Sequence, residues 1–263
     1  MAIIFLTNQE DEKMFNSVHI SYMIISGLIT IALLVLLRIF CKSEKSKSIA
    51  VRFFAVITVI IHYSSLWVDF FTTGSAMADA SMLLPLYACN VCMWLLLITA
   101  FVKKRDNFAY RTLSEFAFWA GCVCGFIGIL LNEQFGINPD ISNYHILKGL
   151  LSHSTMIVGA ALLAVLGFVK IRVKSVLSVA IGLTLFVVDG AVINALFAYF
   201  ELPPCNSMYL LEVPFADLPW LNGGFIAVAS LSTAFVLSAL FEQIFLAKNE
   251  RWYMLISRKR QSK

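Results

Sequence analysis

Charge is scarce in this sequence. Only 14% of its 263 residues are Asp, Glu, Lys or Arg, against about 25% in a typical soluble domain. Hydrophobic residues make up 60% and form long uninterrupted runs. This composition excludes an ordinary soluble domain. The formal net charge of +4 does not indicate nucleic-acid binding, because the cations lie in and beside the connections between apolar runs.

Two further features are missing. The stretch before the first apolar run carries Glu10, Asp11 and Glu12 against a single Lys13. It therefore lacks the basic n-region of a secretory signal, and we expect no cleaved signal peptide. A disulfide framework is also missing. Of the six cysteines, only Cys205 lies in a long loop, and a buried free cysteine behaves as a small hydrophobic residue.

The sequence does contain seven apolar runs. About 20 such residues span the hydrocarbon core of a bilayer, because a helix rises about 1.5 Å per residue and the core is about 30 Å thick. The predicted fold is all-α: a polytopic membrane protein with a seven-helix transmembrane bundle over residues 17–247, a short extracytoplasmic segment (1–16) and a basic tail (248–263). The predicted helices are Ser17–Phe40, Ala50–Phe71, Met82–Val102, Ser114–Leu131, Ile146–Val169, Lys174–Phe200 and Trp220–Ala247.

The cations predict the orientation. Lys and Arg collect on the cytoplasmic side of short loops. Of the 20 Lys and Arg residues, 18 lie in or beside the connections after the first, third, fifth and seventh predicted helices, and only Lys13 and Lys148 lie on the other side. The prediction is a multi-pass protein of the plasma membrane with its N-terminus outside and its C-terminus in the cytoplasm. The basic tail is interpreted mainly as a topology determinant.

Polar residues gather in the predicted outer half of the membrane. His62 and Asp69 share one face of the second helix, and Asp189 lies near the middle of the sixth. The remaining ones are Cys89, Asn90, Ser152, His153 and Asn194. Ionisable residues within spans normally face the bundle interior or a wet cavity, so the pattern predicts a polar cavity open to the outside. The alternative is that each group is satisfied locally, by a carbonyl one turn back or by a neighbouring helix.

Four pieces of the sequence together resemble one family. They are LPLYAC (Leu84–Cys89), LLSHSTMIV (Leu150–Val158), Asn194 and the loop string CNSMYLLEVP (Cys205–Pro214), in which Asn206, Met208, Tyr209, Leu210 and Pro214 match. In this order and spacing they resemble the YwaF-like family of bacterial membrane proteins, related to eukaryotic transmembrane acyltransferases that remodel ether phospholipids. The resemblance extends from about Trp67 to the seventh helix. Two positions depart from the pattern: many members have His where this chain has Tyr87, and Cys205 replaces a small residue. If that His assists the chemistry in relatives, activity here is reduced or absent.

The resemblance implies a cysteine acyltransferase. Cys89 would attack a phospholipid ester to form a thioester, and a lysophospholipid hydroxyl would then take the acyl group. His153 would accept the thiol proton, because the thiolate is the attacking form. Asn90, Asn194 or Asn206 would hydrogen-bond the developing oxyanion. His62, Asp69, Asp189 and Tyr209 complete the expected substrate pocket. The expected partners are membrane lipids, and no cofactor or metal is expected.

Other interpretations stay open. The same pocket could serve a transporter or sensor of a small molecule or ion, with Asp189 as its proton or cation site. Cys89 and Cys92 form a CxxC pair that a thiol–disulfide oxidoreductase would use. The same two thiols with His153 could bind zinc, although the spacing is not a zinc signature. Finally, Cys89 could be a packing residue and His153 a hydrogen-bonded interior histidine.

Overall fold

The computed structural model describes residues 15–73, 84–132, 140–213 and 219–255. Over these ranges the chain forms helices and no strand, so the predicted all-α class is confirmed. The predicted N-terminal segment, except for residues 15 and 16, and the tail beyond residue 255 lie outside the described residues. The helices are α1 (Ser17–Phe40), α2 (Glu44–Thr73), α3 (Ala88–Phe101), α4 (Phe108–Leu130), α6 (Tyr144–Val165), α7 (Val176–Tyr199) and α8 (Gly223–Phe245), with 3-10 turns η2 (Val173–Ser175), η3 (Ser207–Tyr209) and η4 (Lys248–Glu250).

An asparagine is the N-cap residue of four of these helices. In each case its side-chain oxygen accepts a hydrogen bond from a backbone N–H of the first turn, which satisfies one of the donors that a helix start leaves unpaired. The four caps are Asn16, Asn107, Asn143 and Asn222. α2 and α4 begin more than a turn before their predicted starts at Ala50 and Ser114. The cause is that a helix continues past the hydrocarbon core into polar surroundings, where hydropathy carries no signal.

Six of the described helices are long and apolar enough to cross a membrane. The exception is α3, whose 14 residues reach about 21 Å at 1.5 Å per residue, less than the roughly 30 Å of a hydrocarbon core. The third helix was predicted to start at Met82, which lies outside the described residues. It does not include Leu84–Tyr87, because these residues precede α3 as non-helical chain. That boundary prediction was wrong.

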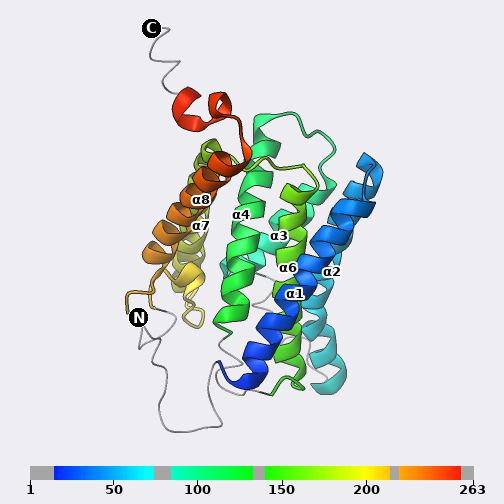
Figure 1. Ribbon diagram of the computed structural model, residues 1–263. Coiled ribbons are helices and arrows are strands. Elements are labelled where there is room, and N and C mark those ends of the chain that lie inside the picture. Colours follow the sequence, from blue (N-terminus) through cyan, green and yellow to red (C-terminus); the bar gives the residue numbers. More distant parts are fainter. Residues whose placement is uncertain (1–14, 74–83, 133–139, 214–218, 256–263) are drawn as a thin grey trace.

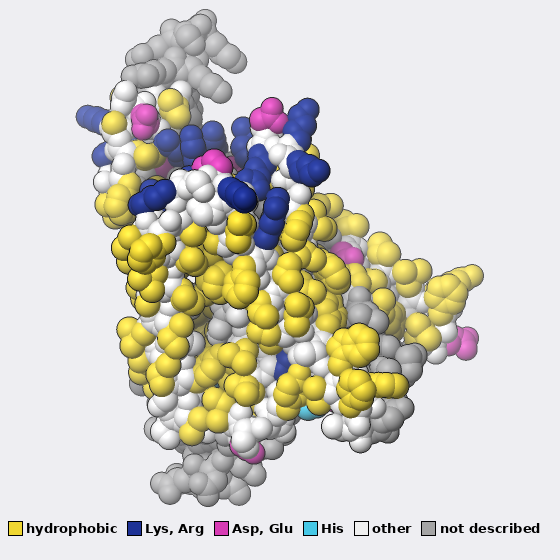
Figure 2. Space-filling view, turned by 90° about the vertical axis from the view of Figure 1, so that its right-hand side faces the viewer, with side chains coloured by type: hydrophobic (Ala, Val, Ile, Leu, Met, Phe, Trp, Pro, Cys, Tyr) yellow, Lys and Arg dark blue, Asp and Glu magenta, His cyan; other side chains and the backbone are white. Residues whose placement is uncertain are grey.

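The helices run up and down in one bundle (Figure 1). α6 lies at its centre and packs most extensively against α4 and α2, while α1 covers α6 and α7 packs against α4 and α8. Because consecutive helices reverse direction, the cation-rich connections meet at one end. Figure 2 shows Lys and Arg gathered there, above a wide hydrophobic surface. Large apolar side chains on the outer faces of α1, α7 and α8 are exposed, as expected for a surface that contacts lipid.

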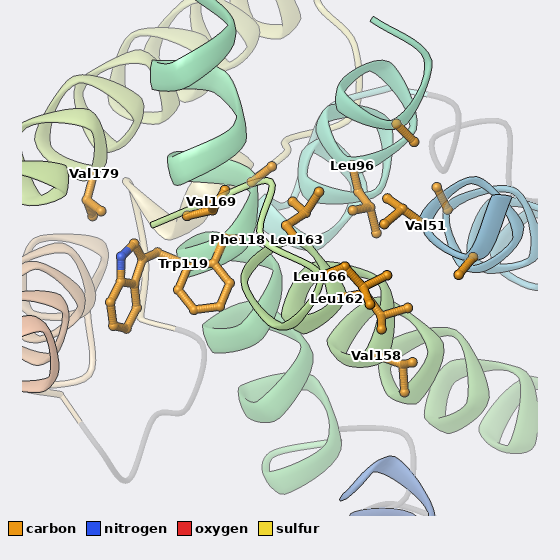
Figure 3. Packing of buried hydrophobic residues seen from close by; sticks show 14 of the residues in the cluster. Val51, Leu96, Phe118, Trp119, Val158, Leu162, Leu163, Leu166, Val169 and Val179 are labelled. Carbon is orange, nitrogen blue, oxygen red and sulfur yellow. The ribbon is translucent and has the colours of Figure 1, made fainter. Parts of the chain in front are cut away.

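The hydrophobic cluster with the most buried residues lies toward this basic end. Figure 3 shows the end of α6 packed against α2, α3 and α4. Its members include Val51, Leu96, Phe118, Leu162 and Leu166. Three glycines of α4 allow α6 to approach: a Cβ on Gly121 would meet Ala160, and one on Gly125 would meet Ile157. The third, Gly128, lies against the ring of His153.

Several interior polar groups are satisfied between helices. His19, fully buried on α1, hydrogen-bonds through Nε2 to the Ile129 carbonyl at 2.7 Å. The Glu242 carboxylate is also buried, and it accepts the backbone N–H groups of Val173 at 2.8 Å and Trp252 at 2.7 Å. Glu242 therefore ties the chain after α8 to η2.

Candidate functional site

One cavity of about 630 Å³ occupies the other half of the bundle. α2, α3, α4, α6, α7, α8 and η3 all contribute to its wall. Its polar lining includes His62, Cys89, Asn90, Asn132, His145, Lys148, Ser152 and His153. Its apolar lining includes Phe116, Trp119, Ala120, Val123, Leu183, Phe186 and Ile226. The cavity is therefore amphipathic, and five of the predicted site residues line it together: His62, Cys89, Asn90, His153 and Tyr209.

Cys89 lies in the first turn of α3, not two turns inside a helix as predicted. The thiol faces the Asn90 Oδ1 at 3.5 Å, and the Asn90 amide reaches back to the Leu84 carbonyl at 3.4 Å. The chain before it is non-helical because Pro85 has no N–H to offer a helix and Leu86 binds elsewhere. Cys89 is thus presented to the cavity at the start of a short helix, where the dipole favours negative charge.

The loop segment η3 holds this non-helical stretch in place. The backbone N–H of Met208 donates to the Leu86 carbonyl at 2.8 Å, and the Ser207 hydroxyl donates to the same oxygen at 3.0 Å. The rings of Tyr87 and Tyr209 pack with their centroids 5.5 Å apart. Non-helical backbone within a membrane is tolerated where it is buried in protein or lines a cavity; here Leu86 is buried and Tyr87 lines the cavity. Tyr87 and Tyr209 both line the cavity.

Asn194 positions η3 from α7 without lining the cavity. Its Oδ1 accepts the Ser207 N–H at 2.8 Å and the Cys205 thiol at 3.2 Å, and its Nδ2 donates to the Ser207 carbonyl at 3.3 Å. Met208 and Tyr209 have φ values of 55° and 53°, in the left-handed region that non-glycine residues rarely adopt. Such strain persists only where the surroundings enforce it.

Asn206 has a different role from the one predicted. Its side chain accepts the N–H groups of Leu211 at 3.0 Å and Glu212 at 3.2 Å in an exposed turn. It does not belong to the cavity wall as the described residues define it. Asn206 and Asn194 therefore shape the loop, and of the three predicted oxyanion donors only Asn90 lines the cavity.

His153 enters the cavity from α6. Its Nδ1 lies 2.7 Å from the Gly149 carbonyl, one turn back. Because a carbonyl only accepts, Nδ1 carries the proton, and in the neutral ring Nε2 is left as the base. The ring lies against Gly128 of α4, where any Cβ would overlap it. The glycine is thus required for the ring to occupy this position.

Replacing Gly128 with alanine should displace the His153 ring and lower stability. Overpacking of this kind costs about 1–3 kcal/mol, which a thermal unfolding scan of the purified protein would detect. Gly27→Ala is the matched control, because nothing lies within 4 Å of a Cβ there and alanine favours a helix by about 0.5–1 kcal/mol. Equal melting temperatures for the two variants would contradict the packing described.

A cationic residue that sequence reasoning had assigned only to loop charge lies in the wall. Lys148, in the second turn of α6, is 9% exposed and lines the cavity, with Nζ 3.4 Å from the Ser65 hydroxyl. His145, also in the wall, pairs through Nε2 with Asp69 Oδ1 at 3.3 Å. Asp69 therefore holds His145 and is not itself in the described lining. The sequence did carry a signal for the place of Lys148, because a lysine among apolar residues near a helix start is unusual for a loop cation.

Three of the alternative interpretations find no support in the described residues. Asp189 on α7 is half-buried with Oδ2 unpartnered among the described residues, and it is not among those that line the cavity. A transporter using this cavity with Asp189 as its ion site is thus not supported. All six cysteines are free, and Cys92 is buried away from the cavity wall. Over the described ranges, no three His, Cys, Asp or Glu side chains form a group able to hold a metal ion.

Comparison with known proteins supplies the family. No curated protein matches the chain, and no solved structure matches it. A family model does match, over residues 14–244, and it is that of the TMEM164 family. The match includes α1 to α7 and nearly all of α8, and thus every segment that builds the cavity. This multi-pass membrane protein belongs to the TMEM164 family.

Proposed function

We propose that the protein is a lipid acyltransferase that moves an acyl chain between phospholipids through a thioester on Cys89. The observation that carries the proposal is that Cys89 of α3 and His153 of α6 line one amphipathic cavity. A phospholipid has the same division into polar and apolar parts as this cavity. The resemblance of LPLYAC and LLSHSTMIV to relatives of ether-phospholipid acyltransferases supports it independently.

The proposed proton transfers use these two side chains. The thiol proton of Cys89 passes to Nε2 of His153, and the sulfur attacks the ester carbonyl carbon of the donor lipid. The tetrahedral intermediate collapses, the C–O bond breaks, and the departing alkoxide takes the proton from Nε2. A thioester remains on Cys89, and a lysophospholipid leaves.

The second half reverses these steps. The hydroxyl of an acceptor lysophospholipid gives its proton to Nε2 as its oxygen attacks the thioester carbon. The C–S bond breaks, and the sulfur recovers the proton, so that enzyme and charge are restored. The amide N–H of Asn90 is a donor beside Cys89 for the oxygen that becomes negative in both tetrahedral intermediates. Such a donor contributes a few kcal/mol when it is well placed.

The membrane arrangement that goes with this proposal has seven spans. α3 is about 21 Å long, and the non-helical residues Leu84–Tyr87 before it add about 3.3 Å each, which together span a hydrocarbon core of about 30 Å. The N-terminus would lie outside and the C-terminus in the cytoplasm of the plasma membrane, because Lys and Arg gather at one end of the bundle (Figure 2) and such residues collect on the cytoplasmic side. The cavity then opens near the outer headgroups.

Trapping the acyl-enzyme tests the proposal. Purified protein is incubated with a phosphatidylcholine carrying a radiolabelled acyl chain and no acceptor, then denatured in acid. We expect label bound to protein, released by neutral hydroxylamine, and located by mass spectrometry on the peptide that contains Cys89. Label that resists hydroxylamine, or protein that stays unlabelled while the lipid is intact, would refute the thioester mechanism.

A further inference from the structure

The polarity of the cavity changes in a fixed order along α6. From the start of the helix, the wall residues are His145, Lys148, Ser152 and His153. On the neighbouring wall, Asn132 lies just beyond the end of α4, and Gly128, Val123 and Trp119 follow in that order back along the helix. The two helices are antiparallel, so their polar ends coincide. The cavity therefore runs from a cationic end, past His153, to an apolar end.

The cationic end is buried at Lys148 and His62, while its third basic side chain, His145, pairs with Asp69. Lys148 is 9% and His62 6% exposed, and Lys148 reaches the hydroxyl of Ser65, which lies one turn from His62 on α2. The Nε2 of His62 has no hydrogen-bond partner among the described residues. No Asp or Glu is found among the described residues of the cavity wall. A lysine in such a place is stabilised when an anion enters.

The geometry points to an anion subsite at Lys148 and His62 that binds the phosphate of the lipid headgroup and sets the position of the ester. The inference rests on the proposed function, because it assigns the headgroup of the same substrate. Lys148 Nζ would bind a phosphate oxygen, and Nε2–H of protonated or tautomerised His62 would donate to a second one. Both are positioning residues, since neither touches the reacting atoms.

The order of wall residues along α6 corresponds to the order of chemical groups in a glycerophospholipid. Lys148 and His153 are five positions apart, a rise of about 7.5 Å. In such a lipid, phosphorus and an ester carbonyl carbon are separated by the short glycerol backbone, and the chains continue beyond the ester. Phosphate at Lys148, ester between Cys89 and His153, and chains against Phe116, Trp119 and Phe186 therefore follow the order of the cavity wall. An uncharged lipid with the same chain would lack the first contact.

Lipid binding in a variant that cannot form a thioester tests the subsite. The full-length chain carrying Cys89→Ala is titrated in detergent and followed by native mass spectrometry. Three oleoyl probes are compared: lysophosphatidylcholine with a phosphate, monooleoylglycerol with none, and oleate with a carboxylate. We expect lysophosphatidylcholine to bind at least about tenfold more tightly than monooleoylglycerol, the effect of one charged hydrogen bond. Lys148→Gln should remove that difference, and Lys148→Arg should retain most of it.

The controls separate the subsite from folding and from the chemistry. Lys47→Gln should leave the preference intact, because Lys47 pairs with Glu44 at the opposite end of the bundle. If Lys148→Gln does not fold, His62→Gln tests the same subsite and should reduce the preference. A phosphate preference that survives both changes, or a dependence on Lys148 for oleate alone, overturns the inference. If acyl trapping fails while the phosphate preference holds, the thioester chemistry is refuted and the anion subsite stands. If trapping succeeds while the preference is absent, the subsite is refuted and the chemistry stands.

Discussion

Replacing Cys89 with alanine is expected to abolish acyl transfer. Removal of a nucleophile that acts together with its base costs on the order of 10⁶-fold in rate, which lies below detection. The physical reason is that no other described thiol combines a place in the cavity wall with the start of a helix: Cys124 also lines the cavity but lies inside α4. The measurement is transfer of a radiolabelled acyl chain from phosphatidylcholine to a lysophospholipid in proteoliposomes.

Two further cysteine variants test whether a loss of acyl transfer in Cys89→Ala is specific to that thiol. Cys122→Ala removes a thiol of α4 that is not among the described wall residues, so the rate should stay within a few-fold of that of the unmodified protein. Cys124→Ala tests the competing nucleophile. If activity disappears in Cys124→Ala and persists in Cys89→Ala, the nucleophile has been assigned to the wrong thiol. If all three variants keep their activity, the acyl chain does not pass through a cysteine of this cavity.

The convergence of distant residues was predictable because depth in a membrane can be counted. Cys89 and His153 each follow the start of an apolar run by a few residues, and the alternation of helices sends both starts to the same end. These two facts bring both residues to the same end of the bundle, and the structure places both in one cavity wall. Which face of each helix looks inward was not predictable in the same way. Asp189 has a suitable depth, yet it lies outside the wall.

Other features depend on contacts that a run of apolar residues does not reveal. α3 starts late because Ser207 and Met208, more than a hundred residues away in the chain, take the Leu86 carbonyl. Lys148 was counted as a loop cation because charge patterns treat every lysine near a helix start alike. Its burial follows from the packing of α2 and α6 side by side, which brings it to Ser65.

The contact between η3 and α3 predicts that Asn194→Ala will be the most damaging change outside the cavity wall. The variant loses the hydrogen bonds to both backbone groups of Ser207, at a cost of about 1–3 kcal/mol. Met208 and Tyr209 are then free to leave their left-handed conformations, which cost about 1–3 kcal/mol each. The segment that holds the Leu86 carbonyl, three residues before Cys89, would shift, and a misplacement of about 1 Å lowers a rate about 100-fold.

Asn206→Ala supplies the comparison, because Asn206 stabilises the same loop from its exposed side. We expect a loss of acyl transfer of about 100-fold for Asn194→Ala and a far smaller one for Asn206→Ala. Limited proteolysis should cut residues 203–211 faster in both variants, so cleavage alone does not separate them. The rate of acyl transfer separates them. Of the two asparagines, only Asn194 holds Ser207, which in turn bonds to Leu86 in the chain before Cys89. Equal rates in the two variants would mean that η3 covers the cavity without positioning the thiol.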